Sequence, residues 1–261
     1  MRTMHLFAGV GGGLLADRIL GHTPLVAVEW EPYACQVLRE RSAEGWFPGL
    51  RVWEGDVRLF DPSEYTGIVD CIHAGFPCQD ISVAGKQAGV SEGTRSGLYR
   101  EVLRIAGIVR PRFLFLENVA AIKGNGLEQV IKDMAIMGYD SRWLCLQASD
   151  VGAPHERDRW FCLGFNTDSC DANRERRPDT SDFYIEKRSP QENEQEGDIW
   201  KSELGTVDVI QRFNSYPEAL RILHGIPNLI HRYKALGNGQ VPLQVAVAFT
   251  ILAEGLIDAY T

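Results

Sequence analysis

The first 165 residues alternate short apolar runs with segments of helical spacing, and this alternation restricts the fold more than any other feature of the sequence. It predicts strands at residues 3–8, 24–28, 69–74, 113–116, 142–146 and 160–165, and helices at 14–20, 31–43, 98–109 and 127–137. Strands that are apolar throughout, with helices between them, are typical of a parallel sheet covered on both faces. We therefore predict an α/β protein whose ligands bind beyond the carboxyl ends of its strands.

The composition is that of an ordinary globular protein. A chain of 261 residues, 44% of them hydrophobic, can bury the core of one large domain, or of a large domain and a small one. No apolar run reaches the roughly 18 residues that a membrane span needs, and the apolar start is too short for a secretory signal. We expect a cytoplasmic protein with no membrane partner. Residues 166–200 contribute −5 (ten acidic, five basic) of the net charge of −8, so a basic cleft elsewhere is compatible with it.

The six cysteines have neither the spacing of a disulfide framework nor a metal-binding pattern such as Cys-x-x-Cys. We expect no metal site and interpret five of them as reduced, mostly buried thiols. The exception is Cys78, which follows the strand predicted at 69–74. A cysteine at the carboxyl edge of a sheet is a candidate nucleophile, because a nearby arginine or helix N-terminus would raise its thiolate fraction. Pro77, directly before it, restricts the local backbone and hence the direction of the thiol.

A glycine-rich turn, Phe-Ala-Gly-Val-Gly-Gly-Gly at 7–13, follows the first predicted strand and opens a helix. Glycines allow the backbone to turn tightly and to approach a ligand. Glu29 closes the second strand 20 residues after Gly9, at the usual place for a carboxylate that binds ribose hydroxyls. A dinucleotide motif Gly-x-Gly-x-x-Gly from Gly9 would need a glycine at Leu14, so a nicotinamide oxidoreductase is disfavoured.

Two further residues fit an adenosine-containing ligand. Asp56 lies near the end of a third candidate strand, where its carboxylate could accept a hydrogen bond from an adenine amino group. Trp30 could stack on the adenine ring, and the alternative is that it simply packs in the core.

Polar residues at the carboxyl edge of the predicted sheet are candidates for catalysis. Glu117 directly follows the strand at 113–116 and could act as an acid or as a structural hydrogen-bonding group. Arg157 and Arg159 precede the strand at 160–165, and strand alternation would place them on one side. They could polarise a carbonyl oxygen or hold a phosphate, or they could form surface ion pairs with Glu156 and Asp158.

Taken together, these motifs resemble those of the DNA cytosine-5 methyltransferase family. The resemblance is carried, in the family's order, by Phe-Ala-Gly-Val-Gly-Gly at 7–12, Glu-Trp at 29–30, Asp56, Gly-Phe-Pro-Cys-Gln at 75–79, Glu-Asn-Val at 117–119, His-x-Arg-x-Arg at 155–159 and Ala-Leu-Gly-Asn-Gly at 235–239. It implies a Rossmann-like fold for S-adenosylmethionine-dependent methyl transfer, with a small target-recognition domain. It also implies transfer of a methyl group to carbon 5 of cytosine in duplex DNA, with S-adenosylhomocysteine as product.

The chemistry explains why such an enzyme needs a thiol. Carbon 5 of cytosine is too weak a nucleophile to take a methyl group directly. Addition of the Cys78 thiolate to carbon 6, with an acid such as Glu117 near ring nitrogen 3, makes carbon 5 enamine-like. Carbon 5 then attacks the sulfonium methyl group of the cofactor, and loss of the proton on carbon 5 expels the thiol. The target base is stacked in a duplex, so the resemblance also implies base flipping.

The resemblance assigns the remaining candidate residues. Catalytic roles fall to Cys78, Glu117, Arg157 and Arg159, and cofactor contacts to Phe7, Ala8, Gly9, Gly11, Gly12, Glu29, Trp30, Asp56, Val57, Pro77, Leu98 and Asn238. The glycine-containing stretch 80–99 resembles the family's active-site loop, where DNA contacts are expected from Gln79, Ser82, Lys86 and Gln87.

The implied organisation is a cofactor-binding and catalytic domain at 1–165, a small target-recognition region at 166–225, and a segment at 226–261 that returns to the catalytic domain through a helix at 242–259. The polar stretch 166–200 is either a solvated insertion or part of the DNA-reading lobe. The chain departs from the family pattern at His5, where Asp is usual, and at His155, where Gln is usual. The target-recognition region is also short.

Two other functions remain open at this point. The same scaffold could methylate cytosine in RNA, such as transfer RNA, or the chain could be a non-catalytic DNA-binding module. The presence of Cys78, Glu117 and both arginines favours an enzyme. We expect a monomer whose partners are duplex DNA and, as a candidate, a cognate restriction endonuclease.

Overall fold

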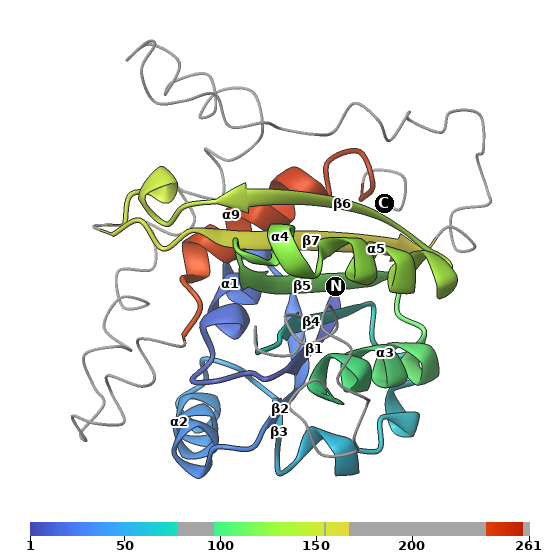
Figure 1. Ribbon diagram of the computed structural model, residues 1–261. Coiled ribbons are helices and arrows are strands. Elements are labelled where there is room, and N and C mark those ends of the chain that lie inside the picture. Colours follow the sequence, from blue (N-terminus) through green and yellow to red (C-terminus); the bar gives the residue numbers. More distant parts are fainter. Residues whose placement is uncertain (78–96, 154, 167–238, 258–261) are drawn as a thin grey trace.

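The computed structural model describes residues 1–77, 97–153, 155–166 and 239–257, and these residues build one seven-stranded sheet between helices (Figure 1). The strand order is β3-β2-β1-β4-β5-β7-β6. The strands are β1 (Arg2–Leu6), β2 (Thr23–Glu29), β3 (Arg51–Glu54), β4 (Cys71–Gly75), β5 (Phe113–Val119), β6 (Tyr139–Leu146) and β7 (Arg159–Asn166). The predicted α/β fold class is therefore confirmed.

Six of the seven strands run in one direction, as the prediction of a parallel sheet requires, and only β7 runs in the opposite direction. Strands β1 to β5 pair in parallel, whereas β7 runs antiparallel to both of its neighbours, β5 and β6. The described residues of the connection between β6 and β7 form the short 3-10 helix Ser149–Val151 and adjacent turns. A parallel pairing needs a crossover connection, usually through an α-helix, and the described residues of this connection form no α-helix, so the chain returns as an antiparallel neighbour.

Helices cover both faces of the sheet. They are α1 (Gly12–Leu20), α2 (Pro32–Ala43), α3 (Gly97–Val109), α4 (Ile122–Asn125), α5 (Leu127–Ile136) and α9 (Pro242–Leu252). Helices α3 and α5 pack on one face, and α1 and α9 share a core on the other face (Figure 1). Because neither face is exposed to water, the central strands are apolar on both sides.

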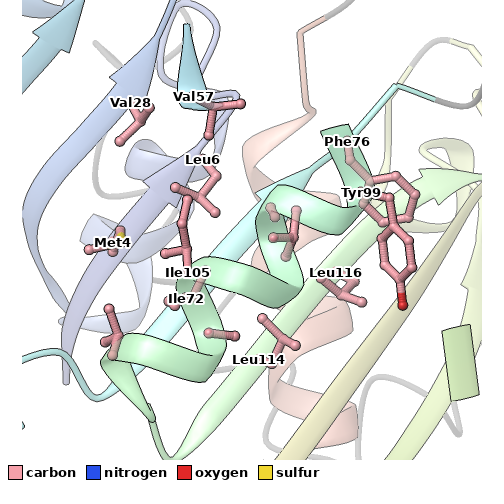
Figure 2. Close-up of a cluster of buried hydrophobic side chains, with 14 of the residues drawn as sticks. Met4, Leu6, Val28, Val57, Ile72, Phe76, Tyr99, Ile105, Leu114 and Leu116 are labelled. Carbon is pink, nitrogen blue, oxygen red and sulfur yellow. The ribbon is translucent and has the colours of Figure 1, made fainter. Parts of the chain in front are cut away.

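The alternation of side chains along the central strands decides which core each residue joins. Leu6, Ile72, Leu114 and Leu116 point toward Ile105 of α3, as Figure 2 shows. Their sequence neighbours Cys71, Phe113 and Phe115 join the core beneath α1 and α9. Polar residues of the strands, His5, His73 and Glu117, have the same parity and lie on this second face.

Helix α9 brings the far end of the described chain back to the sheet. It packs against α1, β6 and β7, and its side chains are buried almost all round. This surrounding core explains why its sequence has no polar face. The helix ends at Leu252, earlier than the predicted residue 259, and Ala253 caps it. The proposed domain boundaries at 165 and 225 stay a prediction, since residues 167–238 lie outside the described residues.

The cysteines that the structure describes form no disulfide. Cys35, Cys71 and Cys162 are buried and Cys145 is partly buried, as predicted for residues that serve packing. Burial, with the nearby charges of Glu29 and Glu54, raises the pKa of Cys35 to about 11. Within the described residues, no helix is long and apolar enough to cross a membrane.

Candidate active site

The glycine-rich loop lies between β1 and α1, at the carboxyl edge of the sheet. Gly11 adopts a left-handed conformation with φ of 97°, which favours glycine and lets helix α1 start directly after it. Phe7 also has a positive φ, 58°, which is uncommon for a residue with a side chain. The loop turns sharply enough for its backbone to face a ligand.

Glu29, at the end of β2, holds this loop in place. Its Oε2 accepts a hydrogen bond from the backbone N–H of Gly9 at 2.7 Å. Its Oε1 accepts from the N–H groups of Trp30 and Glu31, each at 2.9 Å. Glu29, the predicted ribose-binding residue, therefore also stabilises the conformation of the loop. The lone pairs that these N–H groups leave unused remain available for ribose hydroxyls.

Trp30 and Asp56 lie at the rim of the loop region. Trp30 is 72% exposed, so the alternative that it packs in the core is wrong. Asp56 accepts a hydrogen bond from the N–H of Arg58 at 3.0 Å and caps the 3-10 helix Val57–Leu59. Its carboxylate is still 41% exposed and can accept from a ligand. Val57 packs in the α3 core, which leaves only its backbone for a ligand contact.

The segment that leads into Cys78 is anchored next to Glu117. Gly75 at the end of β4 is the register partner of Glu117 on β5. The carbonyl oxygen of Phe76 accepts a hydrogen bond from Nδ2 of Asn118 at 3.0 Å. Pro77 is exposed, and Leu98 packs against the core at the start of α3. Cys78 itself, Asn238 and the predicted DNA contacts Gln79, Ser82, Lys86 and Gln87 lie outside the described residues.

Glu117 is a buried carboxyl group held by a cation. Its Oε1 lies 3.0 Å from Nε of Arg159, and the two side chains are only 11% and 17% exposed. Burial raises the pKa of Glu117, and the charges of Arg159 and Arg157 and the hydrogen bond from Gln240 offset part of that effect. The net direction is toward a group that holds its proton at a higher pH than an ordinary glutamate does.

Arg157 and Arg159 both act on Glu117, but strand alternation is not the reason. Strand β7 begins only at Arg159, and Arg157 precedes it with a left-handed φ of 32°. Arg157 donates from Nη2 to the carbonyl oxygen of Gly239 at 2.5 Å. Burial lowers the pKa of Arg157, with the charge of Arg159 acting in the same direction. Arg159 is ion-paired with Glu117 rather than with Glu156 or Asp158.

A buried polar cluster lies beneath the glycine loop and explains the departure at His5. Nε2 of His5 is 2.6 Å from Oδ2 of Asp17, a residue of α1. Thr3 donates to the same oxygen, and Nδ1 of His22 lies 3.3 Å from Oδ1. The family's usual Asp on this strand is thus replaced by a histidine whose carboxylate partner is on the adjacent helix.

Three site residues were not predicted from the sequence: His73, Gln240 and Gln244. Gln240 directly follows the segment 235–239 that resembles the family's last motif, and this adjacency is the signal that could have indicated it. Gln244 donates from Nε2 to the carbonyl oxygens of Leu146 and Arg157, at 2.8 and 2.9 Å. The described C-terminal segment therefore supports the arginine loop as well as Glu117.

A doubly covered sheet with a glycine-rich loop after its first strand, and acidic side chains at the ends of the next two strands, defines the class of Rossmann-like α/β proteins that bind an adenosine-containing cofactor. Within that class, residues 1–238 match the family model described as C-5 cytosine-specific DNA methylase. The match covers most of the sequence, and the chain belongs to this family.

Similar proteins agree with this assignment. The type II methyltransferase M.CviJI of Paramecium bursaria Chlorella virus IL3A is 37% identical over 169 residues, which are 64% of this chain and 44% of the relative. A crystal structure titled as a putative DNA modification methyltransferase encoded within a prophage of E. coli is 27% identical, with a TM-score of 0.51, and covers 65% of this chain and 47% of that one. This chain thus spans about half the length of these relatives.

A second solved structure shares the fold over nearly the whole length. A triple-substituted DNMT2 of Spodoptera frugiperda superposes with a TM-score of 0.65 and covers 97% of this chain and 99% of that chain. Its sequence identity is 16%, so this likeness concerns the fold alone.

Proposed function

We propose that this protein transfers a methyl group from S-adenosylmethionine to carbon 5 of cytosine in duplex DNA, with Cys78 as nucleophile and Glu117 as acid. The observation that carries the proposal is the buried Glu117 carboxyl group, ion-paired to Arg159 and aligned in register with Gly75, three residues before Cys78. Nucleophile and acid therefore come from neighbouring strand ends, where one pyrimidine ring can contact both.

Glu117 suits the acid role because of its surroundings. Addition of a thiolate to carbon 6 places negative charge on the ring, and a proton or hydrogen bond at nitrogen 3 accommodates it. A carboxyl group whose pKa is raised by burial is closer to sharing its proton near neutral pH than an exposed one. The proton on carbon 5 leaves later, the carbon 6–sulfur bond breaks, and Cys78 is regenerated.

The two arginines support the same reaction. Arg159 holds Glu117, and Arg157 is fixed to the C-terminal segment through Gly239. Both arginines are partly buried, and a cation that is partly removed from water interacts more strongly with the oxygen of a bound ring. We assign them to the carbonyl oxygen of the target cytosine and to the orientation of the acid.

The residues present fit S-adenosylmethionine. The left-handed turn at Gly11 lets the loop backbone approach the cofactor. The exposed ring of Trp30 suits stacking on adenine, and the partly exposed carboxylate of Asp56 suits a hydrogen bond from the adenine amino group. Glu29 contributes its free lone pairs next to the loop that it braces. The cofactor, when bound, supplies an electrophilic methyl group on a sulfonium.

Substrate and partners follow from the relatives rather than from the described residues. Several relatives are named type II methyltransferases, and we propose duplex DNA as substrate, base flipping as its access route, and a cognate restriction endonuclease as partner. We assign target recognition to residues 166–225 and propose that the enzyme acts as a monomer.

The test combines methyl transfer with trapping of the covalent intermediate. The wild-type protein and Cys78→Ala are incubated with tritiated S-adenosylmethionine and mixed-sequence duplex DNA, and then with DNA carrying 5-fluorocytosine. Fluorine at carbon 5 cannot leave as a proton does, so a denaturation-resistant adduct mapping to Cys78 is expected. Cys78→Ala should bind the cofactor but form no adduct.

A parallel arm with transfer RNA separates the two nucleic acids. Methyl transfer to RNA and not to DNA would replace the proposed substrate. Turnover by Cys78→Ala comparable to the wild type would refute the covalent mechanism. Glu117→Gln should slow adduct formation by about 100-fold or more, the usual contribution of a positioned acid. An unchanged rate would remove Glu117 from that role.

A further inference from the structure

Gln240 occupies a niche where three segments of the site meet. Its Nε2 lies 3.3 Å from Oε2 of Glu117 on β5 and 3.2 Å from Nε2 of His73 on β4. A methyl group on Gly12 would lie 2.4 Å from the Gln240 carbonyl oxygen, and one on Gly75 would lie 3.0 Å from Nε2 of Gln240. Only residues without side chains at these two positions let Gln240 approach the glycine loop and β4 so closely.

The two hydrogens of the Gln240 amide both have a partner in this niche. An amide donates only through its nitrogen, and Nε2 of Gln240 is the atom that faces Oε2 of Glu117. The same nitrogen can reach His73 only if the Nε2 of that ring accepts, which requires a neutral imidazole. Burial lowers the pKa of His73 to about 3, so the ring is neutral in the working pH range.

His73 is itself held rigidly. It pairs in register with His5 on β1 and with Phe115 on β5, and its ring centroid is 4.9 Å from each of theirs. Its side chain is buried, with 4% exposure. A ring fixed between two others is a fixed acceptor, and it sets the direction of the amide that donates to it.

We propose that Gln240 is a positioning residue for Glu117: its amide, oriented by neutral His73, holds Oε2 of the carboxyl group while Arg159 holds Oε1. Each oxygen of the Glu117 carboxyl group is thus held by one donor. The orientation of the carboxyl plane, and the position left for the acidic proton, are therefore fixed before the substrate binds. This inference rests on the proposed role of Glu117 and adds a residue that does not touch the substrate.

The arrangement also has an electrostatic consequence. Donation from Gln240 favours the ionised form of Glu117, as do Arg159 and Arg157, against the opposing effect of burial. Removal of the donor should raise the pKa of Glu117 further, and a carboxylate at position 240 should raise it more. Because the protonated acid is the active form, the alkaline limb of the activity profile should move to higher pH.

The experiment measures kcat and kcat/KM for methyl transfer to mixed-sequence duplex DNA against pH for the wild type, Gln240→Met and Gln240→Glu. We expect kcat to fall by about tenfold in Gln240→Met, from lost positioning. We expect the alkaline limb to shift upward in the order wild type, Met, Glu. Gln240→Glu keeps the size of the side chain, so the profile stays measurable even if Gln240→Met fails to fold. Gln129→Met, on an exposed face of α5, is the matched control.

A double-mutant cycle with Glu117→Gln separates this inference from the proposed function. If Gln240 acts through Glu117, Gln240→Met should have little further effect on kcat in the Glu117→Gln background. Full additivity, or a wild-type alkaline limb in both Gln240 variants, would overturn the positioning role. If Glu117→Gln alone retains full turnover, the proposed acid role of Glu117 is refuted, and the Gln240 inference is refuted with it. If Glu117→Gln loses turnover and only the Gln240 results disagree, the Gln240 inference alone is refuted.

Discussion

Asp17 shows how much a single buried side chain can organise. It accepts from Thr3, His5 and His22, and together these residues join β1 and α1 under the glycine loop. Burial alone would raise the pKa of Asp17, but the charge of His5 and the hydrogen bonds from His22 and His5 hold it well below its usual range. The hydrogen bonds from these partners therefore compensate the burial of the Asp17 carboxylate, and the partners in turn need that carboxylate as their acceptor.

We expect Asp17→Asn to lower the free energy of unfolding by about 3–5 kcal/mol, because removal of one partner leaves buried polar groups uncompensated. Chemical denaturation near neutral pH, followed by circular dichroism, measures this loss. Asp140→Asn, on the exposed side of β6, is the matched control and should change little. A loss below about 1 kcal/mol in Asp17→Asn would mean that the network carries little stability.

Glu117 links stability to pH with a definite sign. Its pKa is raised in the folded state, so its contribution to stability is present at low pH and is lost as the pH rises through the folded value. Glu117→Gln cannot ionise and escapes that loss. The variant should therefore gain stability relative to the wild type between about pH 5 and about pH 8, as denaturation at both values can measure. A difference that is constant over this range would contradict a raised pKa.

At the scale of elements, the start of α9 both covers the sheet and holds two neighbouring segments together by hydrogen bonds. Gln244 joins the ends of β6 and of the Arg157 loop through two carbonyl oxygens. Gln244→Met keeps the volume but leaves both carbonyls without this donor, which should cost about 1–3 kcal/mol. Gln36→Met, on the exposed face of α2, should be near neutral.

Gln244→Met also tests whether the two hydrogen bonds of Gln244 serve catalysis. Release of the Arg157 loop should reduce kcat more than it weakens cofactor binding, because the cofactor loop lies on a different element. Methyl transfer assays and calorimetric titration with S-adenosylmethionine make this comparison. Equal losses in both would indicate a general loosening of the fold instead.

At the scale of the whole molecule, the end of the described chain completes a core begun by its first helix. Phe249 of α9 makes edge contacts with His22, just after α1, and with Phe115 of β5, each at 5.2 Å between ring centroids. The core on this face thus joins residues more than 100 positions apart in the sequence. The sheet cannot be covered on this side without the C-terminal segment.

We expect Phe249→Ala to destabilise the entire sheet by about 3–5 kcal/mol, and to do so in a single cooperative transition. Ile136→Ala is the control, since Ile136 is 83% exposed and its truncation should change stability by less than about 0.5 kcal/mol. Thermal unfolding monitored in the near and far ultraviolet distinguishes one transition from two. Two separated transitions would show that α9 folds onto an already stable sheet.

Much of this architecture could be predicted because it depends on local patterns. The apolar runs located the central strands, and the position of Glu117 directly after one of them placed it at the carboxyl edge. The prediction was wrong for β7, since strand direction depends on whether the preceding connection crosses over through a helix, and the turns of this connection carry no strong pattern. The prediction that strand alternation places Arg157 and Arg159 on one side was also wrong, because Arg157 precedes the strand and has a left-handed backbone.

By itself, the sequence determined the α/β class and the family, and it supplied the candidate residues for the proposed chemistry, because hydrophobic periodicity and short motifs are properties of neighbouring residues. Only the tertiary structure decided which donors reach Glu117. Gln240 is 123 residues from Glu117 and 167 from His73, and their contact depends on strand register, on two glycines that leave room, and on the packing of α9. Such contacts are set by how distant segments share one buried volume, and no local pattern encodes that.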